Sequence, residues 1–153
     1  KTFNMTGWRV GFAIGNADVV AALGRTKSII DSGVFSAVQQ AAMAAYEGYR
    51  RPEITATLAM YRERAEALVR GLRECGFRVA DPRATFYVWA GVPQGQDSFG
   101  VAGRLLDEAD VVCVPGAGFG PAGEGYVRFA LTVDVGRIRQ ALDRMRKLKW
   151  QRA

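Results

Sequence analysis

The candidate chemical groups of this sequence of 153 residues include no histidine. Its absence excludes Ser-His and Cys-His nucleophile pairs, histidine zinc motifs and two-histidine iron sites. The two cysteines, Cys75 and Cys113, form no Cys-x-x-Cys pair, so they indicate neither a metal knuckle nor a disulfide framework. We therefore expect no metal site, and two reduced thiols that are mostly buried.

A glycine-rich stretch at residues 116–125 has the composition of a phosphate-binding loop. In a dinucleotide-binding fingerprint, however, such glycines open a helix. Here Pro121 and two further glycines lead into a run that is typical of a strand. We therefore expect a strand–loop–strand connection and no bound nucleotide.

The positive charge of the sequence is concentrated near one end. Lysine and arginine number 21 against 15 aspartate and glutamate residues, a net charge of +6. Most of the excess lies in residues 134–153, on one predicted helix whose dipole favours cations near its end. We therefore expect no nucleic-acid partner. No apolar run approaches the ~20 residues of a membrane span and no signal peptide opens the sequence, so we expect a cytoplasmic protein without a membrane partner.

The elements that must position the functional groups follow from hydrophobic periodicity. The composition, 49% hydrophobic and 24% charged, is that of a folded globular protein. Pro52 at a first helical position and apolar residues at spacings of three and four predict a long helix that ends at Gly76. The other predicted helices are 18–31, 35–49, 98–109 and one capped by Asp134, and the predicted strands are 8–14, 77–79, 85–92, 111–114 and 126–132.

Four segments, in order, resemble one enzyme family. They read Lys1-Thr-Phe-Asn-Met-Thr-Gly-Trp-Arg-Val-Gly, Thr26-Lys-Ser-Ile-Ile-Asp-Ser-Gly-Val-Phe35, Ala84-Thr-Phe-Tyr-Val-Trp89 and Pro115-Gly-x-x-Phe-Gly…Gly125-Tyr-Val-Arg-Phe-Ala130. Together they resemble the class I/II aminotransferases of the aspartate aminotransferase superfamily, the fold type I pyridoxal phosphate enzymes. The first two segments lean toward the LL-diaminopimelate aminotransferase-like subgroup.

The resemblance implies roles for three residues. Lys1 matches the catalytic lysine that binds the aldehyde of pyridoxal 5'-phosphate as an imine and later moves the substrate Cα proton. Arg9 matches the arginine that binds the cofactor phosphate. Arg128 matches the arginine that holds the substrate α-carboxylate with two parallel hydrogen bonds. Trp8, Phe86 and Tyr87 are interpreted as packing residues.

The resemblance also implies an architecture. We expect an α/β chain: residues 1–50 as the remnant of a large cofactor-binding domain, 51–76 as a long interdomain helix, and 77–153 as a small C-terminal domain with a mainly antiparallel sheet packed by helices. The sequence has no initiator Met, and the family's remaining cofactor contacts precede the lysine. We therefore expect the C-terminal part of a longer homodimeric enzyme, and no activity from these residues alone.

The expected reaction moves an amino group between an amino acid and a 2-oxo acid. Two alternatives remain open at this stage. One is another reaction on the same fold, carried out by a lyase or a synthase. The other is a transcriptional regulator whose aminotransferase-like domain senses the cofactor, and the sequence upstream of Lys1 would distinguish these three functions.

Overall fold

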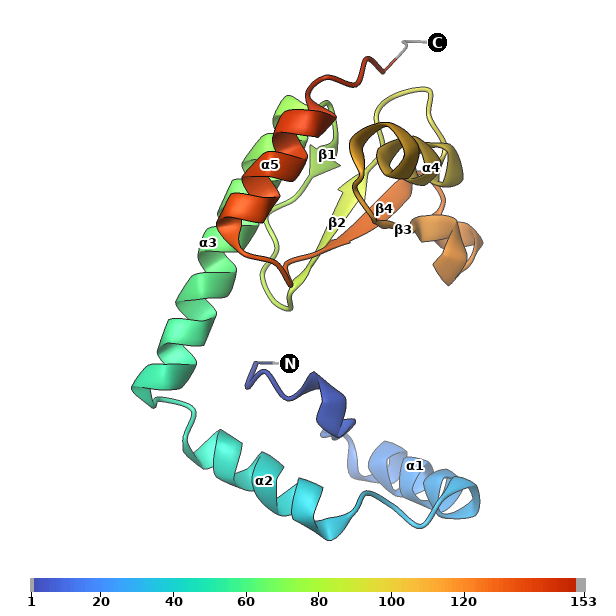
Figure 1. Cartoon of the computed structure of the whole chain (residues 1–153). Helices are drawn as coiled ribbons and strands as arrows, with labels where there is room; N and C mark the ends of the chain where they lie inside the picture. The colour runs from blue at the N-terminus through green and yellow to red at the C-terminus, as the bar shows by residue number, and fades with distance from the viewer. Residues whose placement is uncertain (1, 151–153) are drawn as a thin grey trace. The chain divides into compact units, whose positions relative to one another are not determined.

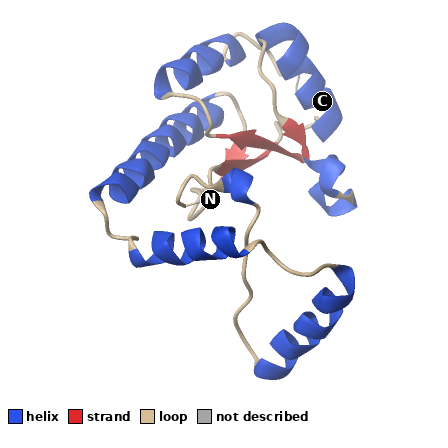
Figure 2. Cartoon of the chain, turned by 60° about the horizontal axis from the view of Figure 1, so that its bottom comes forward, coloured by secondary structure: helices blue, strands red, loops and turns tan. Residues whose placement is uncertain are grey.

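A computed structural model describes residues 2–150 of the chain, which divides into two compact units, Lys1–Thr57 and Leu58–Ala153. Figure 1 labels the elements and Figure 2 separates helices from strands. The fold class is α/β, as the sequence predicts. Among the described residues, no helix is both long and apolar enough to cross a membrane. The elements are η1 (Thr6–Trp8), α1 (Ala17–Ile30), α2 (Ser36–Glu47), α3 (Pro52–Glu74), β1 (Arg78–Val79), β2 (Tyr87–Gly91), α4 (Ser98–Ala109), β3 (Val114–Pro115), η2 (Gly116–Phe119), η3 (Pro121–Gly123), β4 (Tyr126–Ala130) and α5 (Val135–Met145).

The first unit is helical, with helices close to their predicted ranges. Asn16 begins α1 as its N-cap, because its side-chain oxygen accepts hydrogen bonds from the backbone N–H groups of Asp18 (2.9 Å) and Val19 (3.2 Å). The ring of Tyr46 on α2 contacts the rings of Phe3 and Phe12 edge to face, with centroids 5.0 and 5.5 Å away. Aromatic contacts thus hold the beginning of the chain against α2.

The predicted strand at residues 8–14 is not present. Residues 6–8 form the short 3-10 helix η1, Arg9 is left-handed, and residues 9–14 belong to no helix or strand. A strand exists only when a neighbour pairs with its backbone N–H and C=O groups. No strand among the described residues pairs with the backbone of this segment. A β-branched and aromatic composition alone therefore does not make it a strand.

The second unit contains a four-stranded sheet in the order β1-β2-β4-β3, with every neighbouring pair antiparallel. This confirms the predicted small antiparallel sheet. The strands are shorter than predicted, and α4 has the predicted bounds. α3 ends at Glu74, just before Gly76 adopts a left-handed backbone (φ 89°), which favours glycine.

One face of this sheet is covered by helices. Side chains of α3, α4 and α5 form a single core with inward-facing residues of β2 and β4. Figure 1 shows α3 and α5 side by side, and Gly71 of α3 faces the Leu142 side chain of α5. Arg146, the C-cap residue of α5, pairs with Glu74 on α3 at 2.7 Å. The buried hydrophobic residues of the described chain all lie between Leu68 and Met145.

The other face of the sheet carries the candidate functional residues. Side chains of a strand alternate between faces, so Val88 and Ala90 of β2 are buried in the core while Tyr87 and Trp89 point to the opposite side. The same alternation on β4 buries Val127 and Phe129. The residues left on the open face of β4 are Tyr126, Arg128 and Ala130.

Candidate functional site

Arg128 lies in the middle of β4, on the open face of the sheet. Its register partners are Trp89 on β2 and Val114 on β3, so the residue is flanked by strands on both sides. The side chain is half-buried. Pairing with strands on both sides fixes the backbone of Arg128.

The guanidinium of Arg128 lies over the faces of two aromatic rings. Its central carbon, Cζ, is 4.2 Å from the ring centroid of Tyr87 and 4.5 Å from that of Phe119. The described part of the chain provides no carboxylate that pairs with this guanidinium. Arg128 is therefore a cation held by rings, with its N–H donors available to an anion.

An open groove of about 400 Å³ lies beside Arg128. It is lined by Arg128 and Tyr87 of the sheet and by Arg137 and Arg144 of α5, and Asp110 is its acidic lining residue. Arg144 is already bound to backbone carbonyl oxygens, those of Ala109 (2.6 Å) and Asp110 (3.3 Å). The positive charge of the groove suits a small anionic ligand, and its volume is in the range of small-molecule sites, roughly 300–1,000 Å³.

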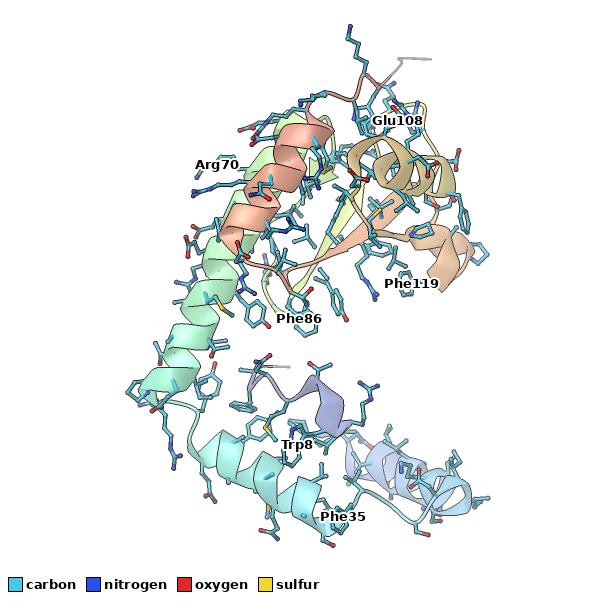
Figure 3. All side chains as sticks on the ribbon, viewed as in Figure 1. Trp8, Phe35, Arg70, Phe86, Glu108 and Phe119 are labelled. Atoms are coloured by element: carbon cyan, nitrogen blue, oxygen red, sulfur yellow. The ribbon has the colours of Figure 1, made fainter. Side chains whose placement is uncertain are left out.

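The glycine-rich stretch forms a strand–loop–strand connection, as predicted. It contains the two 3-10 turns η2 and η3 between β3 and β4, and Phe119 is the last residue of η2. Figure 3 labels Phe119 on this loop. The loop therefore contributes a ring to the Arg128 site.

Ser98, the first residue of α4, anchors this loop. The Ser98 hydroxyl donates to Oε2 of Glu124 (2.8 Å), and the Ser98 backbone N–H donates to Oε1 (2.8 Å). Glu124 also accepts a hydrogen bond from the backbone N–H of Gly125 (2.7 Å). These hydrogen bonds, that of the Ser98 N–H first, lower the pKa of the Glu124 carboxyl below its ordinary value.

Arg9 lies in the first unit, at the end of η1. Its backbone is left-handed (φ 53°), which is uncommon for a residue other than glycine. The side chain is exposed and donates one hydrogen bond, to the backbone oxygen of Thr6 at 3.3 Å. No ion pair with a carboxylate is formed by Arg9 among residues 2–150, so its guanidinium is available to a phosphate.

The remaining residues singled out from the sequence have mixed outcomes. Lys1 lies outside the described residues. Trp8 is 49% exposed and lies outside the hydrophobic core of the described residues, whereas Phe86 is buried in the core as predicted. Cys75 is buried, Cys113 is half-buried, and both are free thiols. Arg9 and Arg128 belong to different units.

The family model "Aminotransferase class I and II" matches residues 1–145. The chain belongs to this family. An LL-diaminopimelate aminotransferase of Syntrophobacter fumaroxidans is 52% identical over 150 residues, which are 98% of this chain and 38% of that protein. An LL-diaminopimelate aminotransferase of Desulforudis audaxviator is 50% identical over 146 residues, 95% of this chain and 37% of that protein.

Solved structures agree with this assignment. An aromatic aminotransferase from Pyrococcus horikoshii matches with a TM-score of 0.80 and 30% identity, over 96% of this chain and 40% of that one. The family assignment therefore confirms the resemblance found in the sequence. The chain spans about two fifths of the length of the aminotransferases it matches.

Sequence reasoning missed two residues of the Arg128 site. The packing role that the sequence predicts for Tyr87 is confirmed, because its ring packs against the core, but its contact with Arg128 is not predicted. The sequence predicts no role for Phe119. Tyr87 is brought near Arg128 by strand register: it lies two positions from Trp89, the register partner of Arg128, and so on the same face. Alternation along β2 is a signal that could have placed Tyr87 on that face, but no sequence pattern gives the position of a loop residue such as Phe119.

Proposed function

We propose that the chain is the C-terminal segment of a pyridoxal phosphate-dependent aminotransferase, which transfers an amino group between an amino acid and a 2-oxo acid. The observation that carries the proposal is the Arg128 guanidinium, which lies on the open sheet face in a positively charged groove and has no carboxylate partner in residues 2–150. Family membership supports it, because class I and II aminotransferases share this chemistry.

The residues present fit the cofactor and the substrate by their donor chemistry. Arg9 offers an exposed guanidinium, whose planar and permanently charged form suits two phosphate oxygens. Arg128 would bind the α-carboxylate of the amino acid in the same manner. Pyridoxal phosphate, when bound, supplies the electron sink that permits the exchange of an amino group for a keto oxygen.

Lys1 is proposed as the catalytic base. Its primary amine would bind the cofactor covalently, would be released when the substrate amine takes its place, and would then take the proton from the substrate Cα and return it. This role requires an uncharged amine near neutral pH, and burial beside another cation favours that form. The amino acid would thus be oriented by Arg128 while Lys1 moves its proton.

The proposed amino acid substrate is LL-diaminopimelate. Relatives named LL-diaminopimelate aminotransferase match 95–98% of this chain at 45–52% identity, and they support this choice. We also propose that the full-length enzyme is a cytoplasmic homodimer. The segment that carries Lys1 and Arg9 would belong to its large domain, and the segment that carries Arg128 would belong to its small domain.

The test is Arg128→Lys in the full-length enzyme. Lysine has one compact charge and cannot match both carboxylate oxygens, which costs about 2–3 kcal/mol for a charge-assisted pair, roughly a 30- to 150-fold loss in kcat/KM. We expect this loss for every amino-acid substrate, with the cofactor absorption spectrum of the resting enzyme unchanged. A primary amine without a carboxylate is the control, and its rate should be almost unaffected.

Two results would contradict the assignment of Arg128. An equal loss for amino acids and simple amines would make it a structural residue of β4. Loss of the cofactor spectrum would place it in the cofactor site. Failure of the unsubstituted full-length enzyme to transfer an amino group from any amino acid would overturn the proposed function itself.

A further inference from the structure

The loop that carries Phe119 is fixed in place by two independent features. Its backbone crosses itself closely at Gly116 and Gly123: a Cβ built on Gly116 would lie 2.0 Å from the Gly123 carbonyl oxygen, so no larger residue fits. Ser98, which is fully buried, holds Glu124, and its hydroxyl also accepts a hydrogen bond from the backbone N–H of Ala117 (3.4 Å). Both ends of the loop are therefore tied to the same serine.

Phe119 contacts other rings although its side chain is 54% exposed. Its ring contacts that of Trp89 edge to face, with centroids 5.9 Å apart. Trp89 is in turn stacked on Tyr126, at 5.5 Å and an interplanar angle of 18°. The open face of the sheet thus provides a continuous row of aromatic contacts for the Phe119 ring.

The rings of Tyr87 and Phe119 contact the Arg128 guanidinium. An arginine side chain has many rotamers, and fixing them on binding costs affinity. The rings of Tyr87 and Phe119, at 4.2 and 4.5 Å from Cζ, restrict those rotamers before a ligand arrives. A guanidinium that lies on ring faces keeps its N–H donors in its own plane, where they remain available to a carboxylate.

We propose that Tyr87 and Phe119 are positioning residues that orient the Arg128 guanidinium for a carboxylate, and that Ser98 and Glu124 keep Phe119 in place for this purpose. This inference rests on the proposed function, because it assumes that Arg128 binds the substrate carboxylate. It adds that the affinity for the carboxylate depends on the aromatic rings and on the loop as well as on the arginine.

The experiment compares Phe119→Leu with a matched control, Phe99→Leu, in the full-length enzyme. Phe99 on α4 is 62% exposed and has no ring contact among the described residues, so it reports the general effect of losing an exposed phenylalanine. We expect Phe119→Leu to raise KM for amino acids roughly tenfold, the scale of one partly desolvated cation–π contact, with kcat changed by less than about twofold. Phe99→Leu should have the same KM as the unsubstituted enzyme. Phe119→Tyr keeps the ring, so its KM should also be close to that of the unsubstituted enzyme.

A binding measurement separates this inference from the proposed function. Calorimetric titration of the full-length protein with propionate, a carboxylate without an amino group, should give a Kd roughly tenfold weaker for Phe119→Leu than for Phe99→Leu. If this ratio holds but no amino transfer is found, the positioning role stands and the proposed function fails. Equal Kd values for the two variants would overturn the positioning role, whatever the activity. An equal rise in KM for a simple amine would overturn it as well.

Discussion

The Cys113 thiol lines the same groove as Arg128. Burial raises its pKa from 9.0 to about 11, because the charged thiolate loses its hydration there. A thiol with such a pKa is almost entirely protonated at neutral pH, and the thiolate is the reactive form. Cys113 is therefore inert in the folded chain despite its position in the groove.

This state of Cys113 can be measured by alkylation. In a Cys75→Ala variant, where Cys113 is the remaining cysteine, we expect iodoacetamide at pH 8 to react roughly 100-fold more slowly with folded than with urea-unfolded chain, because two pKa units change the thiolate fraction by that factor. Equal rates would contradict the burial of the thiol. Since the folded pKa is the higher one, the stability that this thiol contributes is present below pH 9 and is lost as the pH rises toward 11.

At the scale of elements, α3 and α5 approach so closely that one position requires glycine. A Cβ added at Gly71 would lie 2.3 Å from Cδ1 of Leu142, whose side chain is buried in the core. Alanine has the higher helix propensity, by about 1 kcal/mol, but an overpacked core costs about 1–3 kcal/mol. The packing cost is the larger of the two.

We therefore expect Gly71→Ala to lower the free energy of unfolding by up to about 2 kcal/mol, measured with urea. Leu142→Ala leaves a cavity and should cost about 2–5 kcal/mol. In the double variant the new methyl group occupies part of that cavity. The double variant should therefore lose less free energy of unfolding than the sum of the losses of the two single variants. A stabilised Gly71→Ala variant would contradict the close contact of the two helices.

We expect the stability of the connection between β3 and β4 to depend on pH through Glu124. Because hydrogen bonds lower the pKa of this carboxyl in the folded chain, its contribution to stability is present above the ordinary value of 4.5 and is lost as the pH falls below it. We expect Glu124→Gln to have a lower Tm than the unsubstituted chain at pH 7, and the two values to converge in acid. Glu63→Gln, at an exposed position on α3, is the control and should change Tm little at either pH. A difference in Tm that does not change with pH would contradict the role of the ionised carboxylate.

The elements of this chain differ in how well the sequence predicts them. The bounds of α4 and the start of α3 at Pro52 are predictable, because caps and periodicity are local signals. The predicted strands are too long, and the prediction of a strand at residues 8–14 is wrong. The extent of a strand is set by partner strands that lie elsewhere in the sequence. For the same reason the sequence predicts only part of the site. Arg128 is found from its motif, whereas its contacts with Tyr87 and Phe119 depend on the sheet register and the loop conformation.

At the scale of the whole molecule, the two units differ in how much they bury. No residue of α1 or α2 in the first unit is buried, and large apolar side chains such as Ile14, Ile29 and Phe35 are 75–86% exposed. Isolated helices of this length, ~12–15 residues, are marginal in water. The second unit holds the whole described hydrophobic core, from Leu68 to Met145. The stability of the chain therefore resides in the second unit.

Hydrogen exchange of the backbone amides tests this difference. We expect slow exchange in β2, β4, α4 and α5, where opening requires exposure of the core, and fast exchange in α1 and α2. A shorter chain of residues 52–153 keeps every buried hydrophobic residue, so it should unfold in one cooperative transition and show the same slow amides. Equal protection in both units would show that the first unit has a core of its own. Loss of the slow amides in the shorter chain would show that the second unit depends on residues 1–51.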